Sequence, residues 1–113
     1  MTLPEDARLL RIFFGEDDRA QGRPLYEALV GLARKQGLAG ATVLRGPMGF
    51  GRASRLHTAK ILRLSQDLPV VVEIVEAEAK LRDFIRAAEP LLGSALVTLE
   101  RVEVIRYGEA ERT

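Results

Sequence analysis

The residues best suited to chemistry in this sequence lie between Arg45 and Lys60. Three glycines fall within six residues there, and glycine lets the backbone take positive φ angles and approach another molecule closely. Cationic or titratable side chains surround these glycines. The residues concerned are Arg45, Gly46, Gly49, Gly51, Arg52, Arg55, His57 and Lys60. Backbone amides in glycine-rich turns form anion-binding concavities, so the stretch predicts a phosphate- or carboxylate-binding turn. A glycine-rich turn or bulge at a strand end is an equally good interpretation.

Known phosphate-binding motifs do not match this stretch. The order G-x-x-G-x-G lacks the Gly-Lys-Ser/Thr ending of a P-loop, and it differs from the G-x-G-x-x-G pattern of dinucleotide-binding folds. Phe50, between two glycines, is suited either to stacking on a base or a partner or to covering an apolar edge. The sequence therefore predicts an anion site without naming its ligand.

Two other functions are open to the same residues. His57 can act as a general base in a small enzyme or as a metal ligand, although a lone loop histidine is more often simply solvated. A metal-binding trimer of the copper-tolerance type is the other alternative. The chain offers few metal-ligating side chains for it, because it has one histidine, no cysteine and two methionines. No nucleophile or second acid accompanies His57, so we do not expect an enzyme. Glu76 and Glu78 are explained by the preference of helix N-termini for anions.

Composition limits the class of protein. A chain of 113 residues fits one domain, and 47% hydrophobic with 29% charged residues is typical of a soluble globular protein. The formal charge of +1 gives no reason to expect nucleic-acid binding. The first six residues lack the basic and apolar regions of a signal peptide, and no apolar run is long enough to span a bilayer, so we expect a cytoplasmic location.

The elements that must position these residues alternate between strands and helices. Alternating apolar residues predict a strand over 8–14, and a polar loop follows over 16–23. A helix is expected to begin at Pro24 and to end at Gly37, because Leu25, Ala28, Leu29, Leu32 and Ala33 form one apolar stripe. Residues 40–45 predict the second strand, and a long connection then runs to about residue 67, within which 60–64 can extend strand pairing.

The second half repeats this order. Five β-branched residues predict a third strand over 68–75, and an apolar stripe predicts a second helix over 77–89, closed by Pro90 and Gly93. The last element runs from Leu96 to Tyr107, and its apolar residues change phase near 100–101. A bulge or two short strands would explain that change.

The order β-α-β-β-α-β predicts an α+β ferredoxin-like sandwich. Both helices should cover one face of the sheet. The other face would then expose an apolar patch of a kind that monomers avoid, so we expect a homo-oligomer that packs these faces together. The residues of that patch are Leu9, Phe13, Leu44, Val71 and Val75.

The chain also resembles the PII-like proteins, which are related to the nitrogen-regulatory PII signal transducers. The resemblance covers nearly the whole length and is closest to an uncharacterised PII-like branch, some members of which are associated with fluoride-channel proteins. The segments that carry it are Gly22-Arg23-Pro24-Leu25-Tyr26-Glu27-Ala28, Gly37-Leu38-Ala39-Gly40-Ala41-Thr42-Val43, Gly49-Phe50-Gly51-Arg52, His57-Thr58, Leu68-Pro69 and Val104-Ile105-Arg106-Tyr107-Gly108.

The resemblance implies a homotrimer of ferredoxin-like subunits that holds an adenine nucleotide in the clefts between neighbours. It places Thr42 near the base, Arg106 at a phosphate, and the loop Gly93-Ser94-Ala95 beside the phosphates. It also implies that Gly49-Phe50-Gly51-Arg52 begins a long loop, here about 50–66 with Arg55, His57 and Lys60, that engages a regulated partner. A membrane transporter or channel is the partner that this branch suggests.

Departures from the PII pattern change the expected ligand. Ala95 and Val70 stand where PII proteins have lysines, so binding of a triphosphate in the PII manner is not expected. The stretch 53–66 has no tyrosine, which excludes the tyrosine modification of some PII loops. A monophosphate, another nucleotide or a small anion is expected among Arg45, Arg52 and Arg106.

Overall fold

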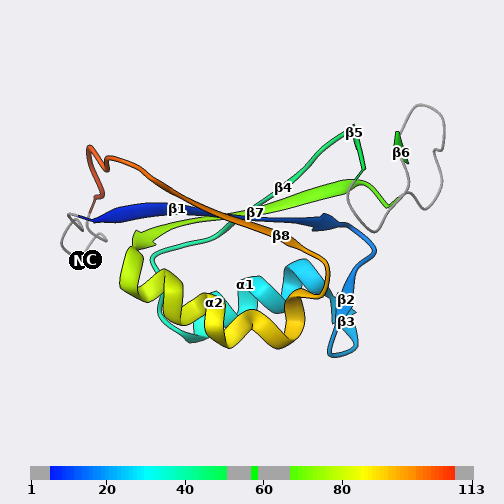
Figure 1. Ribbon diagram of the computed structural model, residues 1–113, viewed down its shortest axis with the longest axis horizontal. Coiled ribbons are helices and arrows are strands. Elements are labelled where there is room, and N and C mark those ends of the chain that lie inside the picture. Colours follow the sequence, from blue (N-terminus) through cyan, green and yellow to red (C-terminus); the bar gives the residue numbers. More distant parts are fainter. Residues whose placement is uncertain (1–5, 51–56, 59–66, 109–113) are drawn as a thin grey trace, which may run out of the picture.

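A four-stranded antiparallel sheet with two helices on one face forms the body of the protein (Figure 1). The computed structural model describes residues 6–50, 57–58 and 67–108. The sheet has the order β4-β7-β1-β8, with β4 at Thr42–Arg45, β7 at Pro69–Ala77, β1 at Ala7–Gly15 and β8 at Leu96–Arg101. The helices are α1 at Leu25–Lys35 and α2 at Glu78–Leu92. This order and layering confirm the ferredoxin-like prediction.

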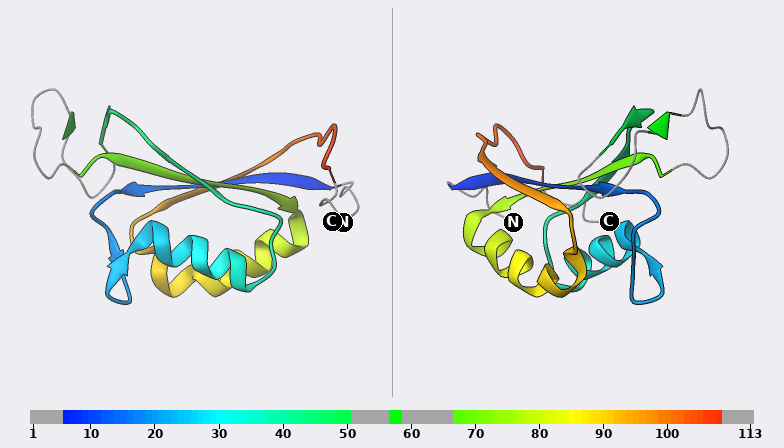
Figure 2. Two further views of the ribbon diagram at one scale, coloured as in Figure 1. Left: turned by 180° about the vertical axis from the view of Figure 1, so that it is seen from behind. Right: turned by 45° about the vertical axis from the view of Figure 1, so that its right-hand side comes forward.

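Both helices pack on the same side of the sheet, and the core lies between the two layers (Figure 2). Alternate residues of β1 and β7 point into it, because side chains of a strand alternate between the two faces. The largest fully buried side chains are Phe84, Leu10, Ile12, Leu25, Leu29, Ile74, Leu81 and Val72. The apolar stripes predicted for the helices supply Leu25, Leu29, Leu81 and Phe84 to this list.

Two short hairpins add to this plan. β2 at Arg19–Ala20 pairs with β3 at Arg23–Pro24, so the predicted loop over 16–23 contains most of a short hairpin that ends at the predicted helix start. β5 at Met48–Gly49 pairs with β6 at His57–Thr58 beyond the end of β4. The extra pairing predicted for 60–64 lies outside the described residues. Pro24 is the N-cap of α1, so the helix begins one residue after the predicted start.

Two predicted boundaries are wrong. Helix α2 does not close at Pro90 but continues through it to Leu92, where Gly93 takes a φ of 54°. A proline this close to the C-terminal end removes only one backbone donor, and burial of Leu92 offsets that loss. Strand β8 has neither a bulge nor a second part, because it ends at Arg101, where the apolar residues change phase. Residues 102–108 continue without regular structure.

The pairing register of the strands determines which residues lie side by side on the open face. We define the open face as the side of the sheet away from the helices. Residues opposite one another in neighbouring strands point to the same side. Leu44, Val71, Phe13 and Leu96 therefore form one apolar row across all four strands. The next row along the strands is polar and consists of Thr42, Glu73, Arg11 and Thr98. Val75 and Leu9 follow on the central strands, opposite Glu100.

Candidate functional site

The larger pocket lies at the end of the sheet where the 46–66 connection begins, and we call it the loop-end pocket. It has a volume of about 550 Å³. Four residues of the predicted ligand set line it, namely Gly46, Gly49, Phe50 and Ser94. Apolar walls come from the open-face row through Phe13, Val71 and Leu96. Among the described residues of this lining, the ionisable side chains are the carboxylates Asp18 and Asp67, and none of these described residues is a cation that would favour a phosphate.

The glycines of this pocket serve packing as well as any ligand. A Cβ on Gly46 or on Gly49 would lie 3.0 Å from the ring of Pro69, so only glycine fits there without a shift. The Gly46 amide donates to the Pro69 carbonyl at 2.8 Å. This amide is therefore already used, and the anion-binding turn predicted from the glycines has one donor fewer than expected.

The turn after β1 contacts both stems of the connection. Glu16 pairs with Arg45 at 2.8 Å on the incoming side. On the outgoing side, the Asp17 amide donates to Asp67 Oδ1 at 2.8 Å, and the Glu16 amide donates to the Leu68 carbonyl at 2.8 Å. Arg45, predicted as a ligand residue, thus has a carboxylate partner that an anionic ligand would have to replace.

Asp18 is the titratable group of the loop-end pocket whose environment disfavours its charge. Burial raises the pKa of Asp18, the amide of Gly15 opposes this by donating to Oδ2 at 3.3 Å, and the nearby carboxylates of Asp67 and Asp17 raise it further. The acidic lining of this pocket therefore opposes an additional negative charge unless a cation from elsewhere enters the pocket.

A second, smaller pocket lies at the opposite end of the sheet, and we call it the Tyr107 pocket. It has a volume of about 260 Å³. Thr42, the predicted base-contacting residue, lines it together with Glu73, Glu76 and Tyr107. The Tyr107 hydroxyl donates to the Ala39 carbonyl at 3.4 Å and thereby joins the C-terminal segment to the loop before β4. The remaining lining residues are Leu9, Ala39, Gly40, Ala41, Val75 and Val104.

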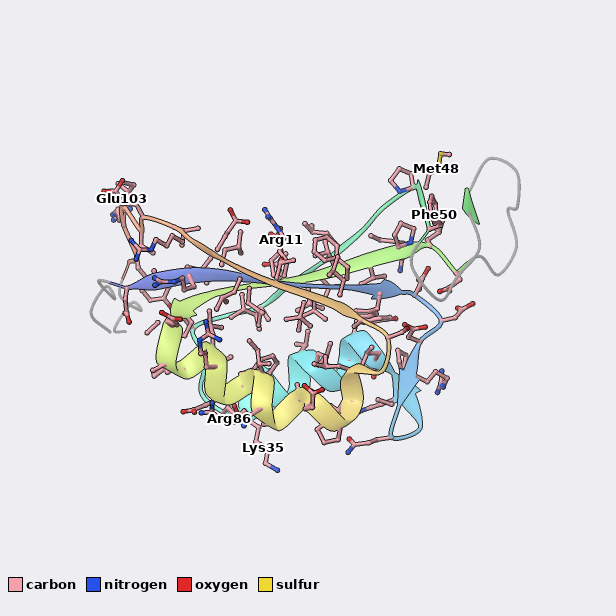
Figure 3. All side chains as sticks on the ribbon, viewed as in Figure 1. Arg11, Lys35, Met48, Phe50, Arg86 and Glu103 are labelled. Carbon is pink, nitrogen blue, oxygen red and sulfur yellow. The ribbon has the colours of Figure 1, made fainter. Side chains whose placement is uncertain are left out.

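The predicted ligand residues are thus divided between the two ends of one subunit. The loop end holds Gly46, Gly49, Phe50 and Ser94. Gly93, which caps α2, directly precedes Ser94. Thr42 lines the Tyr107 pocket, and Arg106 lies in the same C-terminal segment as Tyr107. Figure 3 places Phe50 and Glu103, three residues before Arg106, at opposite ends of the molecule. A single subunit does not assemble the predicted set.

The remaining predicted residues belong to the connection after β4. Gly51, Arg52, Arg55 and Lys60 lie outside the described residues. His57 is paired with Gly49 in the β5–β6 hairpin. The described residues contain no group of three or more His, Cys, Asp or Glu side chains placed to hold a metal ion. Among the described helices, neither is long and apolar enough to cross a membrane.

Sequence reasoning missed an ion-pair cluster at the centre of the open face. Arg11 Nε lies 2.9 Å from Glu73 and its Nη1 lies 2.8 Å from Glu100, so one guanidinium on β1 links the two neighbouring strands. Figure 3 shows Arg11 on the side of the sheet away from the helices. The hydrogen bond to Glu73 is the main cause that raises the pKa of Arg11, and the charge of Glu100 adds to it. The three residues are far apart in sequence, and only the register brings them together.

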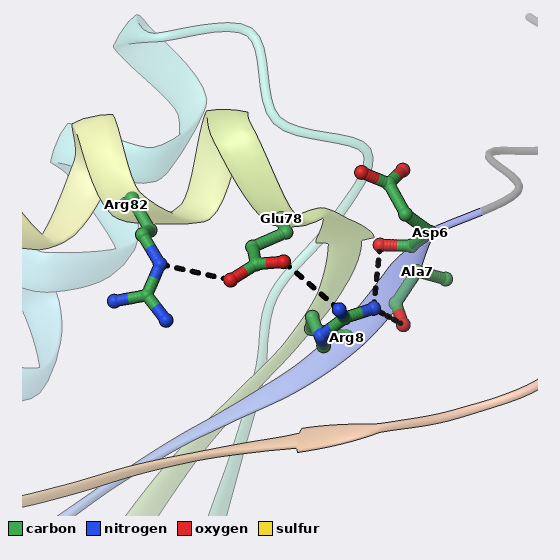
Figure 4. A network of polar contacts seen from close by, with 5 residues as sticks. All are labelled: Asp6, Ala7, Arg8, Glu78 and Arg82. Atoms are coloured by element: carbon green, nitrogen blue, oxygen red, sulfur yellow. Dashed lines mark hydrogen bonds and ion pairs between the residues drawn. The ribbon is translucent and has the colours of Figure 1, made fainter.

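A second polar cluster ties the start of α2 to the start of β1 (Figure 4). Glu78 accepts from Arg82 at 2.9 Å and pairs with Arg8 at 2.9 Å, while Arg8 also donates to the carbonyls of Asp6 and Ala7. The hydrogen bond from Arg82 is the main cause that lowers the pKa of Glu78. Glu78 is thus held by cations at the helix start, as expected of an anion there. Glu76, however, precedes the helix and belongs to β7.

Several solved structures have a similar fold. CPII from Thiomonas intermedia K12, a nitrogen regulatory PII-like protein solved with ADP, AMP and bicarbonate, superposes with a TM-score of 0.66 at 16% identity, over 88% of this chain and 89% of that one. GlnK of B. subtilis in complex with ATP gives a TM-score of 0.57 at 13% identity, over 89% of this chain and 85% of that one. At these identities the likeness concerns the fold.

Sequence relatives identify the branch. A UPF0166 protein of Aquifex aeolicus (strain VF5) is 43% identical over 100 residues, which cover 87% of this chain and 92% of the relative. The family model of DUF190, described as Uncharacterized ACR, matches residues 7–104. These matches confirm the resemblance to an uncharacterised PII-like branch, and the chain belongs to the DUF190 family.

Proposed function

We propose that this protein is a regulatory module that assembles as a homotrimer through its open sheet face and binds an adenine nucleotide or a related anion between subunits. The observation that carries the proposal is the division of the ligand residues between two pockets at opposite ends of the open face. Cyclic packing of these faces would bring the Tyr107 end of one copy to the loop end of the next. The site is therefore incomplete without a neighbour.

Exposure of the open face supports the assembly. Phe13, Leu44 and Leu96 of the apolar row are 38%, 47% and 59% exposed, which is unusual for large apolar residues in one continuous row. The Arg11 cluster beside this row is paired within the subunit. Copies can therefore pack face to face without burying an unpaired charge.

The chemistry of the loop-end pocket favours a ligand with few phosphates. Asp18 and Asp67 line it, Arg45 is paired with Glu16, and Ala95 and Val70 lie where a PII protein would have lysines. Arg106 of a neighbouring subunit would supply positive charge to a pocket whose described lining contains no cation. CPII, with the same fold, was solved with AMP and ADP, which agrees with such a ligand.

In this proposal the protein signals by binding and not by catalysis. The segment 50–66, including Arg55, His57 and Lys60, contacts a regulated partner, and a membrane transporter or channel is our candidate. A ligand can change this contact only by binding one conformation of the loop more tightly than another.

The test combines light scattering with calorimetric titration of AMP, ADP and ATP into the full chain. We expect a trimer that binds AMP or ADP at least as tightly as ATP. Arg106→Ala should weaken binding about tenfold or more, since a hydrogen bond to a charged group contributes about 1.5–3 kcal/mol. Arg86→Ala, on the exposed side of α2, is the matched control and should change nothing. A monomer at working concentration, or a trimer that binds none of the three, contradicts the proposal.

A further inference from the structure

Ile105 is an exposed apolar residue that the assembly proposed above does not use. Its exposed fraction of 79% is the highest of any large apolar side chain in the described part of the chain. A single exposed apolar residue is ordinary on a protein surface, so this exposure alone indicates no function. Ile105 differs from an ordinary surface residue because both of its flanks hold it in this exposed position.

The segment around Ile105 is fixed to its own subunit on each side. Val104 and Tyr107 line the Tyr107 pocket, and the Tyr107 hydroxyl donates to the Ala39 carbonyl at 3.4 Å. Between these two residues, Ile105 and Arg106 are both exposed. No ion pair among the described residues includes Arg106. The segment thus presents an apolar side chain and an adjacent cation to the outside of the subunit.

The loop-end pocket has the complementary chemistry. Its lining includes an apolar wall of open-face residues, Phe13, Val71 and Leu96, and the carboxylates of Asp18 and Asp67. In the described contacts each carboxylate accepts one backbone amide, so acceptor positions remain for a cation. A volume of about 550 Å³ leaves room for an isoleucine side chain beside a small ligand. An apolar side chain next to an arginine fits this combination of walls and charges.

The exposed segment and the loop-end pocket are too far apart to meet within one subunit. Figure 3 places Glu103, two residues before Ile105, at the opposite end of the molecule from Phe50, which lines this pocket. Ile105 can therefore reach such a pocket only in another copy of the chain. Three lining residues also belong to the apolar row of the open face, so the pocket is continuous with the proposed contact between subunits.

We infer that Ile105 inserts against the apolar wall of the loop-end pocket of the next subunit and positions Arg106 beside Asp18 and Asp67 there. This inference rests on the proposed trimer and adds to it the residue that anchors each copy to its neighbour. In a closed ring, every copy gives one Ile105 and receives one. An arginine positioned in this way neutralises the acidic lining, which would otherwise oppose an anionic ligand.

The first experiment measures how tightly the copies of the full chain assemble, by light scattering over a dilution series. Ile105→Glu should make the trimer dissociate at a protein concentration about tenfold or more higher, because it removes an apolar contact and adds a third carboxylate to the pocket. Ile105→Lys should dissociate at a lower concentration than Ile105→Glu, since the lining is acidic. Ile105→Leu keeps the apolar contact and should assemble like the unmodified protein. Because Ile105 is exposed within the subunit, these variants should all fold, which circular dichroism checks.

The second experiment tests which residues meet. The chain has no cysteine, so a disulfide can form only between introduced thiols. Ile105→Cys combined with Leu96→Cys should give covalent trimers on mild oxidation, because one disulfide at each contact links all copies of a closed ring. Ile105→Cys combined with Arg86→Cys is the matched control and should give no covalent trimers, since Arg86 lies on the exposed side of α2 (Figure 3).

The outcomes distinguish this inference from the proposed function. A trimer whose Ile105→Glu variant assembles as tightly as the unmodified protein overturns the role of Ile105 and leaves the proposed trimer and its ligand intact. An assembled sample in which Ile105→Cys and Leu96→Cys give no covalent trimers also overturns the contact. If the unmodified protein is a monomer, the proposed assembly is wrong and the inference fails with it.

Discussion

Both faces of the sheet carry large apolar side chains, but the two faces differ in what covers them. On the helix side, Leu10, Ile12, Val72 and Ile74 are almost completely buried by α1 and α2. On the open side, Phe13, Leu44 and Leu96 remain substantially exposed around the paired charges of Arg11. The closed face therefore stabilises the subunit, whereas the open face is suited to contacts between subunits.

The largest expected effect comes from breaking the closed face. Phe84 is fully buried, and Phe84→Ala should lower the free energy of unfolding by about 3–5 kcal/mol, because it removes a large apolar side chain and leaves a cavity. Urea denaturation followed by circular dichroism measures the change. Phe13→Ala is the matched control on the open face and should cost less in dilute solution. Equal losses would mean that the two faces do not differ.

The next effect concerns assembly. Leu44 lies in the apolar row of the open face and lines neither pocket, so Leu44→Glu should place a charge in the contact between subunits without touching a ligand. We expect light scattering to give the mass of a monomer, with an unchanged far-ultraviolet spectrum. Arg86→Glu, on the helix side, should keep the assembled mass. An assembled Leu44→Glu protein would show that the copies meet through another surface.

A smaller effect is expected at the centre of the open face. Arg11→Gln leaves Glu73 and Glu100 without their shared cation, so the melting temperature should fall by a few degrees. The difference in melting temperature between Arg11→Gln and the unmodified protein should shrink in high salt if the cluster is exposed, because salt screens exposed charges. Melting curves at low and high salt, with protein concentration varied, measure it. A deficit that persists in high salt would instead indicate that assembly covers the cluster.

The smallest effect is a pH dependence at the loop end. Because burial raises the pKa of Asp18, the folded protein binds a proton there more strongly than the unfolded chain. Its contribution to stability is therefore complete below the unfolded pKa, about 4, and is lost as the pH rises through the folded pKa. Asp18→Asn should raise stability at pH 7 by a few tenths of a kcal/mol, given its partial exposure.

Thermal melts of Asp18→Asn and of the unmodified protein at pH 7 and pH 3 measure this effect. The asparagine side chain of the variant keeps an oxygen for the Gly15 amide, so the comparison isolates the charge. The two proteins should melt alike at pH 3, where Asp18 is protonated. A gain of equal size at both values would mean that the charge of Asp18 is not its cause.

Sequence reasoning found the two helices and the four strands of the main sheet, but it missed the two short hairpins and some of the element ends. The apolar stripes of α1 and α2 and the alternation in β1 predicted each element, because these periods follow from local backbone geometry. Pro90 suggested too early an end for α2, since burial of Leu92 outweighs one lost donor. The change of phase near Arg101 suggested a bulge or a second strand, whereas the strand ends there.

The candidate site was predictable only in part. The glycines after β4 and the loop before β8 were recognised, and the structure places Gly46, Gly49 and Ser94 around one pocket. The Arg11 cluster and the burial of Glu76 were not foreseen. Both depend on residues far apart in the chain, Glu73 and Glu100 for Arg11 and Ala39 for Glu76.

The sequence by itself determined the order of the elements and which residues share a face of each strand or helix. It also determined the apolar patch on the side of the sheet away from the helices. These properties depend on neighbours a few residues apart. The tertiary structure decided which rows the open face forms, which carboxylates are buried or paired, and that the ligand residues lie at opposite ends of one subunit. These properties depend on the register between strands, which no local pattern specifies.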